Sequence, residues 1–283
     1  GVYGVLRIVS QMSVPEQIHT AGVVILAAGV VTSLWGVMLA AIQNDVKRLL
    51  AYSSIENIGV IFIGLGIALL AQAAGNTMVV TLSMCGALLH TINHSFFKSL
   101  LFFGAGNLYS QMHTTLLDRF GGAAKHMPVT AILFLLATMA ICALPPLNGF
   151  VGEFLIYLGM LGSVRDGINT LYAAGGIMAL ALTGGVVVLA FTKLYSTVFL
   201  GSPRHHHVAE SEEVDSLRIA AMAIPALGII AIGLFPQYAI WAVERVANVL
   251  TNGHSVMVNA GIVTTLSRLS LTAILLVIVI TLL

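Results

Sequence analysis

Long uncharged runs alternate with short polar segments along most of the chain. The runs are Thr20–Asn44, Asn57–Phe97, Met127–Gly152, Gly167–Thr192 and Ile219–Val243, and a shorter one, Leu269–Leu283, closes the chain. A helix needs roughly 20 apolar residues to cross the hydrocarbon core of a bilayer, and the longer runs meet that length. Allowing for isolated charges, the pattern predicts helices at about 20–43, 49–72, 77–109, 128–163, 170–199, 217–241 and 264–283, after a segment, 1–10, that ends an earlier span.

The runs predict helices rather than a β-barrel, the other architecture that satisfies backbone polar groups in lipid. Barrel strands alternate apolar and polar residues with a period of two, and runs such as Val23–Ala28 show no such alternation. We therefore predict an all-α, polytopic transmembrane helix bundle of about seven helices plus the partial first one.

The composition supports a lipid environment. Of the 283 residues, 58% are hydrophobic and 8% are charged, whereas soluble domains carry about 25% charged residues. The formal net charge is +1, and no basic run is available to bind nucleic acid. The two cysteines, Cys85 and Cys142, lie in apolar runs and fit neither a disulfide framework nor a CxxC metal motif.

The polar segments predict an orientation. Lysine and arginine gather in the loops 44–48, 110–127 and 200–216, and the positive-inside rule places these three loops in the cytoplasm. The chain opens inside an apolar pattern and carries no signal-peptide pattern, so we expect it to be an internal piece of a longer membrane protein.

Three titratable residues share one face of the helix predicted at 77–109. His90, His94 and Lys98 follow one another at intervals of four, which advances a helix by about 400° and forms one stripe. Lys98 lies about 16 Å from the nearer end of the span, too deep for its side chain to reach the interface. A lysine at that depth costs about 2.5–3.5 kcal/mol on insertion scales. The stripe predicts a proton relay, and the alternative is a set of polar side chains that only bind neighbouring helices.

A metal or haem site is a further alternative for His90 and His94. A His-x3-His pair can bind zinc on one helix face. However, no glutamate follows His90 as the HExxH motif requires, and no third carboxylate or thiolate ligand is apparent. Haem ligation requires histidines on facing helices, and the deep histidines lie on this span alone. We therefore predict no metal and no cofactor.

The segment Pro145-Pro146-Leu147-Asn148-Gly149 interrupts the span 128–163. Two prolines remove two backbone donors and clash with the preceding carbonyls, so the helix must break there. A broken helix in a membrane is tolerated where protein or a water-filled cavity satisfies the freed groups. We expect Asn148 or Gly149 to cap the second half and Glu153 to fall in its first turn. An ionised, buried Glu153 needs a nearby cation, and Lys98 is the expected partner, in a proton path or in a structural pair.

Glu56 is the remaining acidic residue inside a predicted span. It lies about 12 Å along the helix from Arg48, so it is either a carboxylate at which protons enter or an interfacial residue in water. The proton pathway predicted from the residues comprises Glu56, His90, His94, Lys98 and Glu153.

Three motifs carry a family resemblance. They are Asn44-Asp45-Val46-Lys47-Arg48-Leu49-Leu50-Ala51-Tyr52-Ser53-Ser54, His90-x3-His94-Ser95-Phe96-Phe97-Lys98, and Pro145-Pro146-Leu147-Asn148-Gly149-Phe150-Val151-Gly152-Glu153-Phe154. With them the chain resembles, over about residues 1–200, the antiporter-like proton-pumping membrane subunits of respiratory complex I and of membrane-bound hydrogenases. The glutamate in Ile55-Glu56-Asn57-Ile58-Gly59 is more similar to the hydrogenase branch.

The resemblance implies a fragment of a fold with two inverted five-helix repeats, each containing a broken helix, followed by further helices. Residues 1–19 would end the preceding transmembrane helix and its loop, and 20–199 would be the second repeat. The loop 200–216 and the C-terminal helices 217–283 would follow. His90, His94, Lys98 and Glu153 match channel positions of the family, whose other channel residues would precede Gly1.

The resemblance also implies a function. We expect a proton-translocating membrane subunit of an energy-converting oxidoreductase of the hydrogenase or formate hydrogenlyase type, in the prokaryotic inner (cytoplasmic) membrane. Such subunits carry no cofactor and catalyse no redox step, and their partners are other membrane subunits and a peripheral redox arm. The alternatives are a stand-alone Na⁺/H⁺ antiporter, a complex I-type NADH-quinone oxidoreductase subunit, a membrane redox enzyme with histidine-bound metal or haem, and a structural scaffold.

Overall fold

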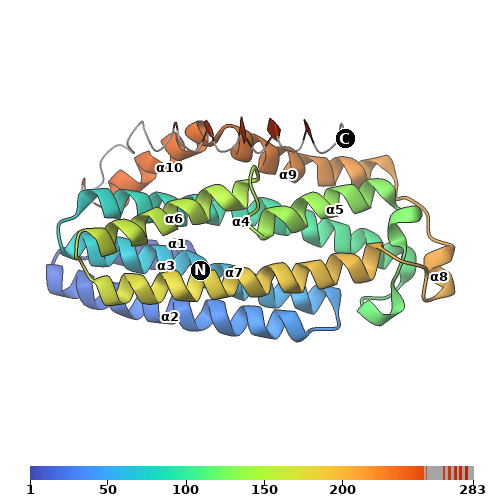
Figure 1. The fold of residues 1–283 in the computed structure, drawn as a ribbon, viewed down its shortest axis with the longest axis horizontal. Coiled ribbons are helices and arrows are strands. Elements are labelled where there is room, and N and C mark those ends of the chain that lie inside the picture. Colours follow the sequence, from blue (N-terminus) through green and yellow to red (C-terminus); the bar gives the residue numbers. More distant parts are fainter. Residues whose placement is uncertain are drawn as a thin grey trace.

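The chain folds into an elongated bundle whose long helices run along its longest axis (Figure 1). This computed structural model describes residues 1–251 and, beyond them, 253, 264, 267, 268, 271, 272, 274, 275, 278 and 279. The helices are α1 (Val2–Val9), α2 (Pro15–Ile42), α3 (Val46–Ala73), α4 (Thr77–Met112), α5 (Pro128–Ile141), α6 (Asn148–Arg165), α7 (Thr170–Phe199), α8 (His206–Ala209), α9 (Ser216–Leu234) and α10 (Pro236–Leu250). Two short 3₁₀ helices, η1 (Leu117–Arg119) and η2 (Ala123–Lys125), lie between α4 and α5. The predicted all-α fold is confirmed, and most of the predicted span 264–283 lies outside the described residues.

Local chemistry explains where the helices begin. Pro15 and Pro128 start α2 and α5, where a missing N–H costs nothing. The carboxylate of Asp45 accepts a hydrogen bond from the Arg48 backbone N–H at the start of α3. The side chain of Asn76 does the same for α4. These signals are visible in the sequence and place the helix starts within a few residues of the predicted positions.

The bundle has a membrane-protein arrangement. Four helices, α2, α3, α7 and α9, are long and apolar enough to cross a bilayer within the described part of the chain. The outer helices α2 and α7 expose large apolar side chains such as Trp35 and Leu189, whereas α3 and the middle of α4 are mostly buried. Apolar side chains on the outside are stable in lipid and unstable in water. The chain is an integral membrane protein.

Glycines allow α2 and α3 to pack backbone against backbone. A Cβ atom added to Gly59 would lie 2.7 Å from the Gly29 carbonyl oxygen, and one added to Gly36 would lie 2.6 Å from the Glu56 backbone nitrogen. Small residues let helix backbones approach closely in membranes, where dispersion contacts rather than the hydrophobic effect drive association. The close approach of α2 therefore fixes the position of the α3 segment around Glu56.

The loops predicted to lie on one side of the membrane gather at one end of the bundle. The Val46 backbone N–H donates to the Thr115 carbonyl over 2.9 Å, and the Leu117 N–H donates to the Asn44 carbonyl over 2.9 Å. The Gly122 N–H donates to the Leu200 carbonyl over 2.8 Å. The α2–α3 connection, the segment after α4 and the segment after α7 thus form one surface, which holds α8 as well (Figure 1).

The helix predicted at 217–241 is wrong in its extent. α9 ends at Leu234, and α10 starts at Pro236 and continues to Leu250. Between them Phe235 has φ −123° and ψ 57°, outside the helical region. A proline disfavours helical geometry in the preceding residue, and here Phe235 leaves the helix and Pro236 begins the next one.

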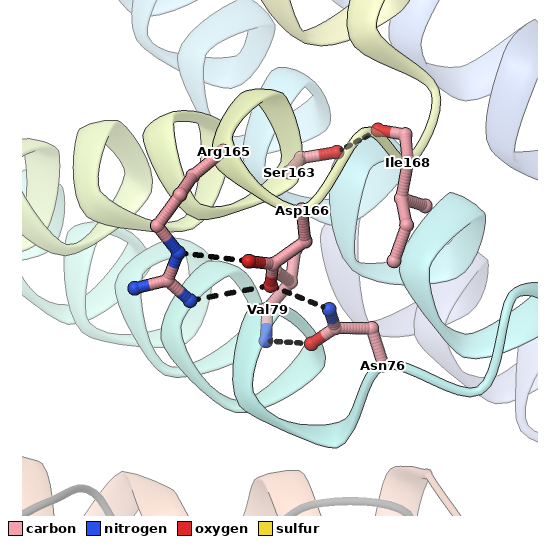
Figure 2. A network of polar contacts seen from close by, with 6 residues as sticks. All are labelled: Asn76, Val79, Ser163, Arg165, Asp166 and Ile168. Carbon is pink, nitrogen blue, oxygen red and sulfur yellow. Dashed lines mark hydrogen bonds and ion pairs between the residues drawn. The ribbon is translucent and has the colours of Figure 1, made fainter.

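A polar network at the opposite end ties the α6–α7 connection to the start of α4 (Figure 2). The Asn76 side chain accepts from the Val79 N–H over 3.0 Å and donates to the Asp166 carboxylate over 2.9 Å. The Arg165 guanidinium contacts the same carboxylate at 2.7 Å. These hydrogen bonds, first from Arg165 and then from Asn76, hold the pKa of Asp166 below its usual range.

The network predicts a pH-dependent stability. Because the folded-state pKa of Asp166 is lowered, its contribution is present above the unfolded pKa of about 3.9 and is lost as the pH falls through the folded value. We expect Asp166→Asn to lower the thermal unfolding midpoint slightly at pH 7 and to match the unsubstituted protein once the pH is below the folded-state pKa of Asp166. The exposed Asp118, substituted in the same way, is the control. A midpoint difference that persists unchanged to pH 3 would contradict the assignment.

Candidate functional site

The broken span consists of α5 and α6 end to end (Figure 1). α5 ends at Ile141, α6 begins at Asn148, and Pro145 and Pro146 lie in the connection, as the two prolines predicted. A Cβ atom added to Gly149 would collide with the Ala140 carbonyl oxygen, so the start of α6 packs tightly against the end of α5.

The start of α6 differs from the prediction in one detail. Leu147 precedes the helix in an extended conformation, and no side chain in the described part of the chain caps α6. Because Asn148 is already helical, Glu153 lies in the second turn rather than the first. The expected cap at Asn148 or Gly149 is wrong, since Leu147 occupies the cap position and both residues lie inside the helix.

The predicted histidine–lysine stripe lies in the interior of the bundle. His90 and Lys98 on α4 are buried, with 1% and 5% of their surface exposed, and His94 is half-buried. The Phe97 ring meets the rings of His90 and His94 edge-on, at centroid distances of 6.2 and 5.6 Å. His90 and Lys98 are therefore held away from lipid and from bulk water, whereas His94 is partly accessible.

The Lys98 ammonium binds α3. Its Nζ donates to the Leu50 carbonyl oxygen over 2.8 Å and to the Ser53 hydroxyl in a short contact. The Ser53 hydroxyl in turn donates to the Leu50 carbonyl over 3.1 Å. The Phe191 ring lies 5.9 Å from the ammonium. A buried ammonium needs such partners, because an unpaired charge in the interior is far more costly than a paired one.

A hydrogen-bonded triad joins Glu56 to His90. Glu56 is 2% exposed, which rules out the expected alternative of an interfacial residue in water. The Asn57 side chain donates to the Glu56 carboxylate over 2.5 Å and to the Ser53 carbonyl over 2.8 Å. The Asn57 Oδ1 atom lies 3.1 Å from His90 Nε2. Ser53 thus links Lys98 to Glu56, because its hydroxyl contacts the Lys98 ammonium and its carbonyl accepts from Asn57, which binds Glu56.

A second amide pair links α4 to the broken helix. The Asn93 side chain donates to the Asn148 carbonyl over 2.7 Å, and the Asn148 side chain donates to the Asn93 carbonyl over 3.4 Å. A Cβ atom added to Gly152 would lie 3.0 Å from His90 Cβ and 3.1 Å from Asn93 Nδ2. The glycine therefore lets α6 approach the polar face of α4.

The expected pairing of Lys98 with Glu153 is wrong. Glu153 is half-buried on α6, and no ion pair joins it to a cation among the described residues. Lys98 and Glu56 attract each other electrostatically, but no ion pair joins them in the described part of the chain either, and Glu153 repels Glu56. The reason is the packing of α3 on α4. It places the Leu50 carbonyl and the Ser53 hydroxyl against the Lys98 ammonium, which therefore contacts α3 rather than Glu153 on α6.

Sequence reasoning missed Ser53, Asn57 and Asn93. A usable signal existed, because Ser53, Glu56 and Asn57 are spaced three and four residues apart and therefore share one helix face. Asn93 likewise follows His90 by three. Within the described residues, no three histidine, cysteine, aspartate or glutamate side chains come together as a metal site.

The residues of the site lie in a segment that is similar to known proteins. Residues 1–183 match the family model described as NADH:quinone oxidoreductase/Mrp antiporter, TM. The chain belongs to this family. The three sequence motifs, and with them the polar face formed by α3, α4 and the broken helix, fall within the matched residues.

Individual relatives agree with this membership. The chain is 34% identical to hydrogenase-4 component B of Escherichia coli (strain K12) over 265 residues, which cover 93% of the chain and 39% of that protein. It is 38% identical to formate hydrogenlyase subunit 3 of the same organism over 185 residues, 65% of the chain and 30% of that protein. A chain of respiratory complex I from Thermus thermophilus shares the fold, with a TM-score of 0.67 and 24% identity over 86% of this chain and 47% of that one. The chain thus spans less than half the length of these relatives.

Proposed function

We propose that the chain is part of a proton-translocating membrane subunit of an energy-converting oxidoreductase complex of the hydrogenase or formate hydrogenlyase type. The observation that carries the proposal is a buried cluster between α3 and α4. In it Lys98 contacts Ser53, Ser53 contacts Asn57, and Asn57 contacts both Glu56 and His90. The relatives that the chain matches over most of its length are subunits named for those complexes.

The free-energy cost of placing charged side chains in the bilayer supports a functional role for the cluster. A charged side chain in the middle of a bilayer costs about 2.5–3.5 kcal/mol on insertion scales, and intramembrane ionisable residues therefore mark ion paths by default. A scaffold needs hydrogen bonds between helices, which uncharged asparagines such as Asn93 and Asn148 already supply here. Lys98 and Glu56 add titratable groups that packing alone does not require.

The proton pathway in this proposal comprises Glu56, His90, His94, Lys98 and Glu153. Residues 20–199 act as the second antiporter-like repeat, after the end of a preceding helix and loop in 1–19 and before the loop 200–216 and the helices from 217 onward. Proton movement is driven by electrostatics: a change of charge at Lys98 alters its attraction to Glu56, which in turn alters the repulsion between Glu56 and Glu153.

The partners in this proposal are other membrane subunits and a peripheral redox arm, which performs the electron chemistry. We place the protein in the prokaryotic inner membrane, with the shared loop surface in the cytoplasm. That surface carries most of the loop cations, namely Lys47, Arg48, Arg119, Lys125, Arg204 and Arg218.

Glu153→Gln in the full-length subunit tests the proposal. The substitution keeps the size of the side chain and removes its titration, so we expect the complex to assemble and to translocate severalfold fewer protons per turnover in proteoliposomes. Glu16→Gln, at the exposed start of α2, is the matched control. Unchanged translocation in Glu153→Gln would favour the scaffold. Sodium-dependent proton flux from the full-length subunit without redox partners would instead favour the stand-alone antiporter.

A further inference from the structure

The Asn57 side chain stands between the two titratable groups of the triad. One amide hydrogen is directed at the Ser53 carbonyl oxygen and the other at the Glu56 carboxylate, while Oδ1 faces His90 Nε2. All three residues are buried, with Asn57 itself 2% exposed. The amide thus bridges the Glu56 carboxylate and the His90 imidazole.

The orientation of the amide follows from its partners. The Ser53 carbonyl has lone pairs and no hydrogen, so it can only accept, and the atom that faces it must be Nδ2. This holds whatever the protonation state of Glu56, because the carbonyl does not titrate. Oδ1 is therefore the atom that faces His90, and an amide oxygen can only accept a hydrogen bond.

We propose that Asn57 is a positioning residue that holds His90 as the Nε2–H tautomer, so that His90 takes up and releases protons at Nδ1 alone. The inference rests on the proposed function, which makes His90 a proton carrier. Since Asn57 Oδ1 accepts, His90 Nε2 must carry the hydrogen, and the neutral ring then has its lone pair on Nδ1. The Nδ1 atom is buried and has no hydrogen-bond partner within the described residues.

The Nε2–H tautomer determines whether His90 can pass a proton through its ring. A histidine that passes a proton through its ring accepts it on one nitrogen and gives up another from the opposite nitrogen. Here the opposite nitrogen faces an amide oxygen that cannot carry a proton onward. A proton that binds Nδ1 produces an imidazolium whose Nε2–H still donates to Asn57, and its release from Nδ1 restores the same tautomer. His90 therefore stores a proton at one side of the ring.

The same amide insulates Glu56 from His90. The Asn57 N–H groups donate hydrogen bonds but do not give up their hydrogens, so no proton passes directly from His90 to Glu56 across Asn57. Under the proposed function, His90 Nδ1 therefore exchanges protons with a group other than Glu56. His94 follows one turn later on α4, and its buried Nε2 likewise has no partner among the residues that the structure describes.

The tautomer is tested by solid-state ¹⁵N NMR of the full-length subunit labelled with ¹⁵N-histidine in its complex. The His90 signals are assigned as those that disappear in His90→Gln. We expect a protonated Nε2 and an unprotonated Nδ1, with the Nε2–H form favoured about tenfold or more, the factor that a buried hydrogen bond supplies. A protonated Nδ1 in the neutral ring would overturn the proposal.

Two substitutions of Asn57 separate positioning from packing. Asn57→Leu removes the acceptor, so the ratio of the two tautomers should fall severalfold. Asn57→Asp keeps an acceptor opposite Nε2, so the ratio should stay on the Nε2–H side. Asn107→Leu replaces another buried asparagine of the bundle, which contacts Met222 rather than His90, and should leave the ratio unchanged. A tautomer ratio that is equal in Asn57→Leu and in the unsubstituted protein would refute the positioning role.

The NMR result is independent of pumping. If His90 has the Nδ1–H form while Glu153→Gln still impairs translocation, the tautomer proposal fails and the proposed function stands. If His90 has the Nε2–H form while Glu153→Gln translocates normally, the local chemistry is confirmed and the proposed function fails.

Discussion

Lys98→Met is expected to nearly abolish proton translocation by the assembled complex. Methionine has a similar length and is stable in an apolar interior, so the helix should still pack. The substitution removes the ammonium that donates to the Leu50 carbonyl and to Ser53, and Glu56 loses the cation that attracts it. Methionine cannot titrate, so the proposed pathway loses the change of charge at Lys98 on which it depends. We therefore expect a loss of at least about tenfold, which corresponds to about 1.4 kcal/mol.

The measurement is the number of protons moved per turnover of the redox arm in proteoliposomes. Lys193→Met provides the matched control. Lys193 also binds backbone carbonyls, those of Ala41 and Gln43 at the end of α2, but lies outside the cluster. It should change stability and leave the proton-to-turnover ratio intact. A normal ratio in Lys98→Met would show that Lys98 serves packing.

Much of the fold could be predicted because its signals are local. The helix predicted at 170–199 coincides with α7, and the one predicted at 77–109 differs from α4 by three residues at its end. Apolar length sets the extent of a span, and the residues that cap α3 and α4 mark their starts. The double proline that separates α5 from α6 is equally local, since it removes the backbone donors directly.

A single proline is a weaker signal. Pro225 lies within α9 and does not end it, whereas Pro236 separates α9 from α10. Both prolines occur in the same apolar run. The sequence next to them does not show which proline lies inside a helix and which one separates two helices. Whether a helix continues past a proline depends on what satisfies the freed backbone carbonyl, and that group comes from neighbouring helices.

Only those features of the site that depend on a single helix could be predicted from the sequence. The spacing of His90, His94 and Lys98 fixes their common stripe, because it depends on one helix alone. The partner of Lys98 depends on how α3 crosses α4, and helix periodicity carries no information on that crossing. The lysine therefore contacts Ser53 and Leu50 where the sequence suggested Glu153.

Among the substitutions proposed here, Gly59→Val is expected to lower the thermal stability of the subunit the most. A Cβ atom at Gly59 would lie 2.7 Å from the Gly29 carbonyl oxygen and from Ser33 Cα, so α2 and α3 must separate. Overpacking costs about 1–3 kcal/mol and occasionally more, and each kcal/mol lowers the unfolding midpoint of a domain of about 150–250 residues by about 2–4 °C. We expect a decrease of several degrees in the full-length subunit in detergent.

Gly185→Val is the control that isolates packing from helix propensity. Gly185 lies on α7 with no atom within 4 Å of an added Cβ in the described part of the chain, so the same residue change there should have little effect. Equal midpoints for the two variants would contradict the tight α2–α3 contact. A second consequence follows from Gly36, which packs against the Glu56 backbone one turn from this contact. Because a displaced α3 carries Ser53, Glu56 and Asn57 away from α4, any Gly59→Val protein that still assembles should also translocate fewer protons.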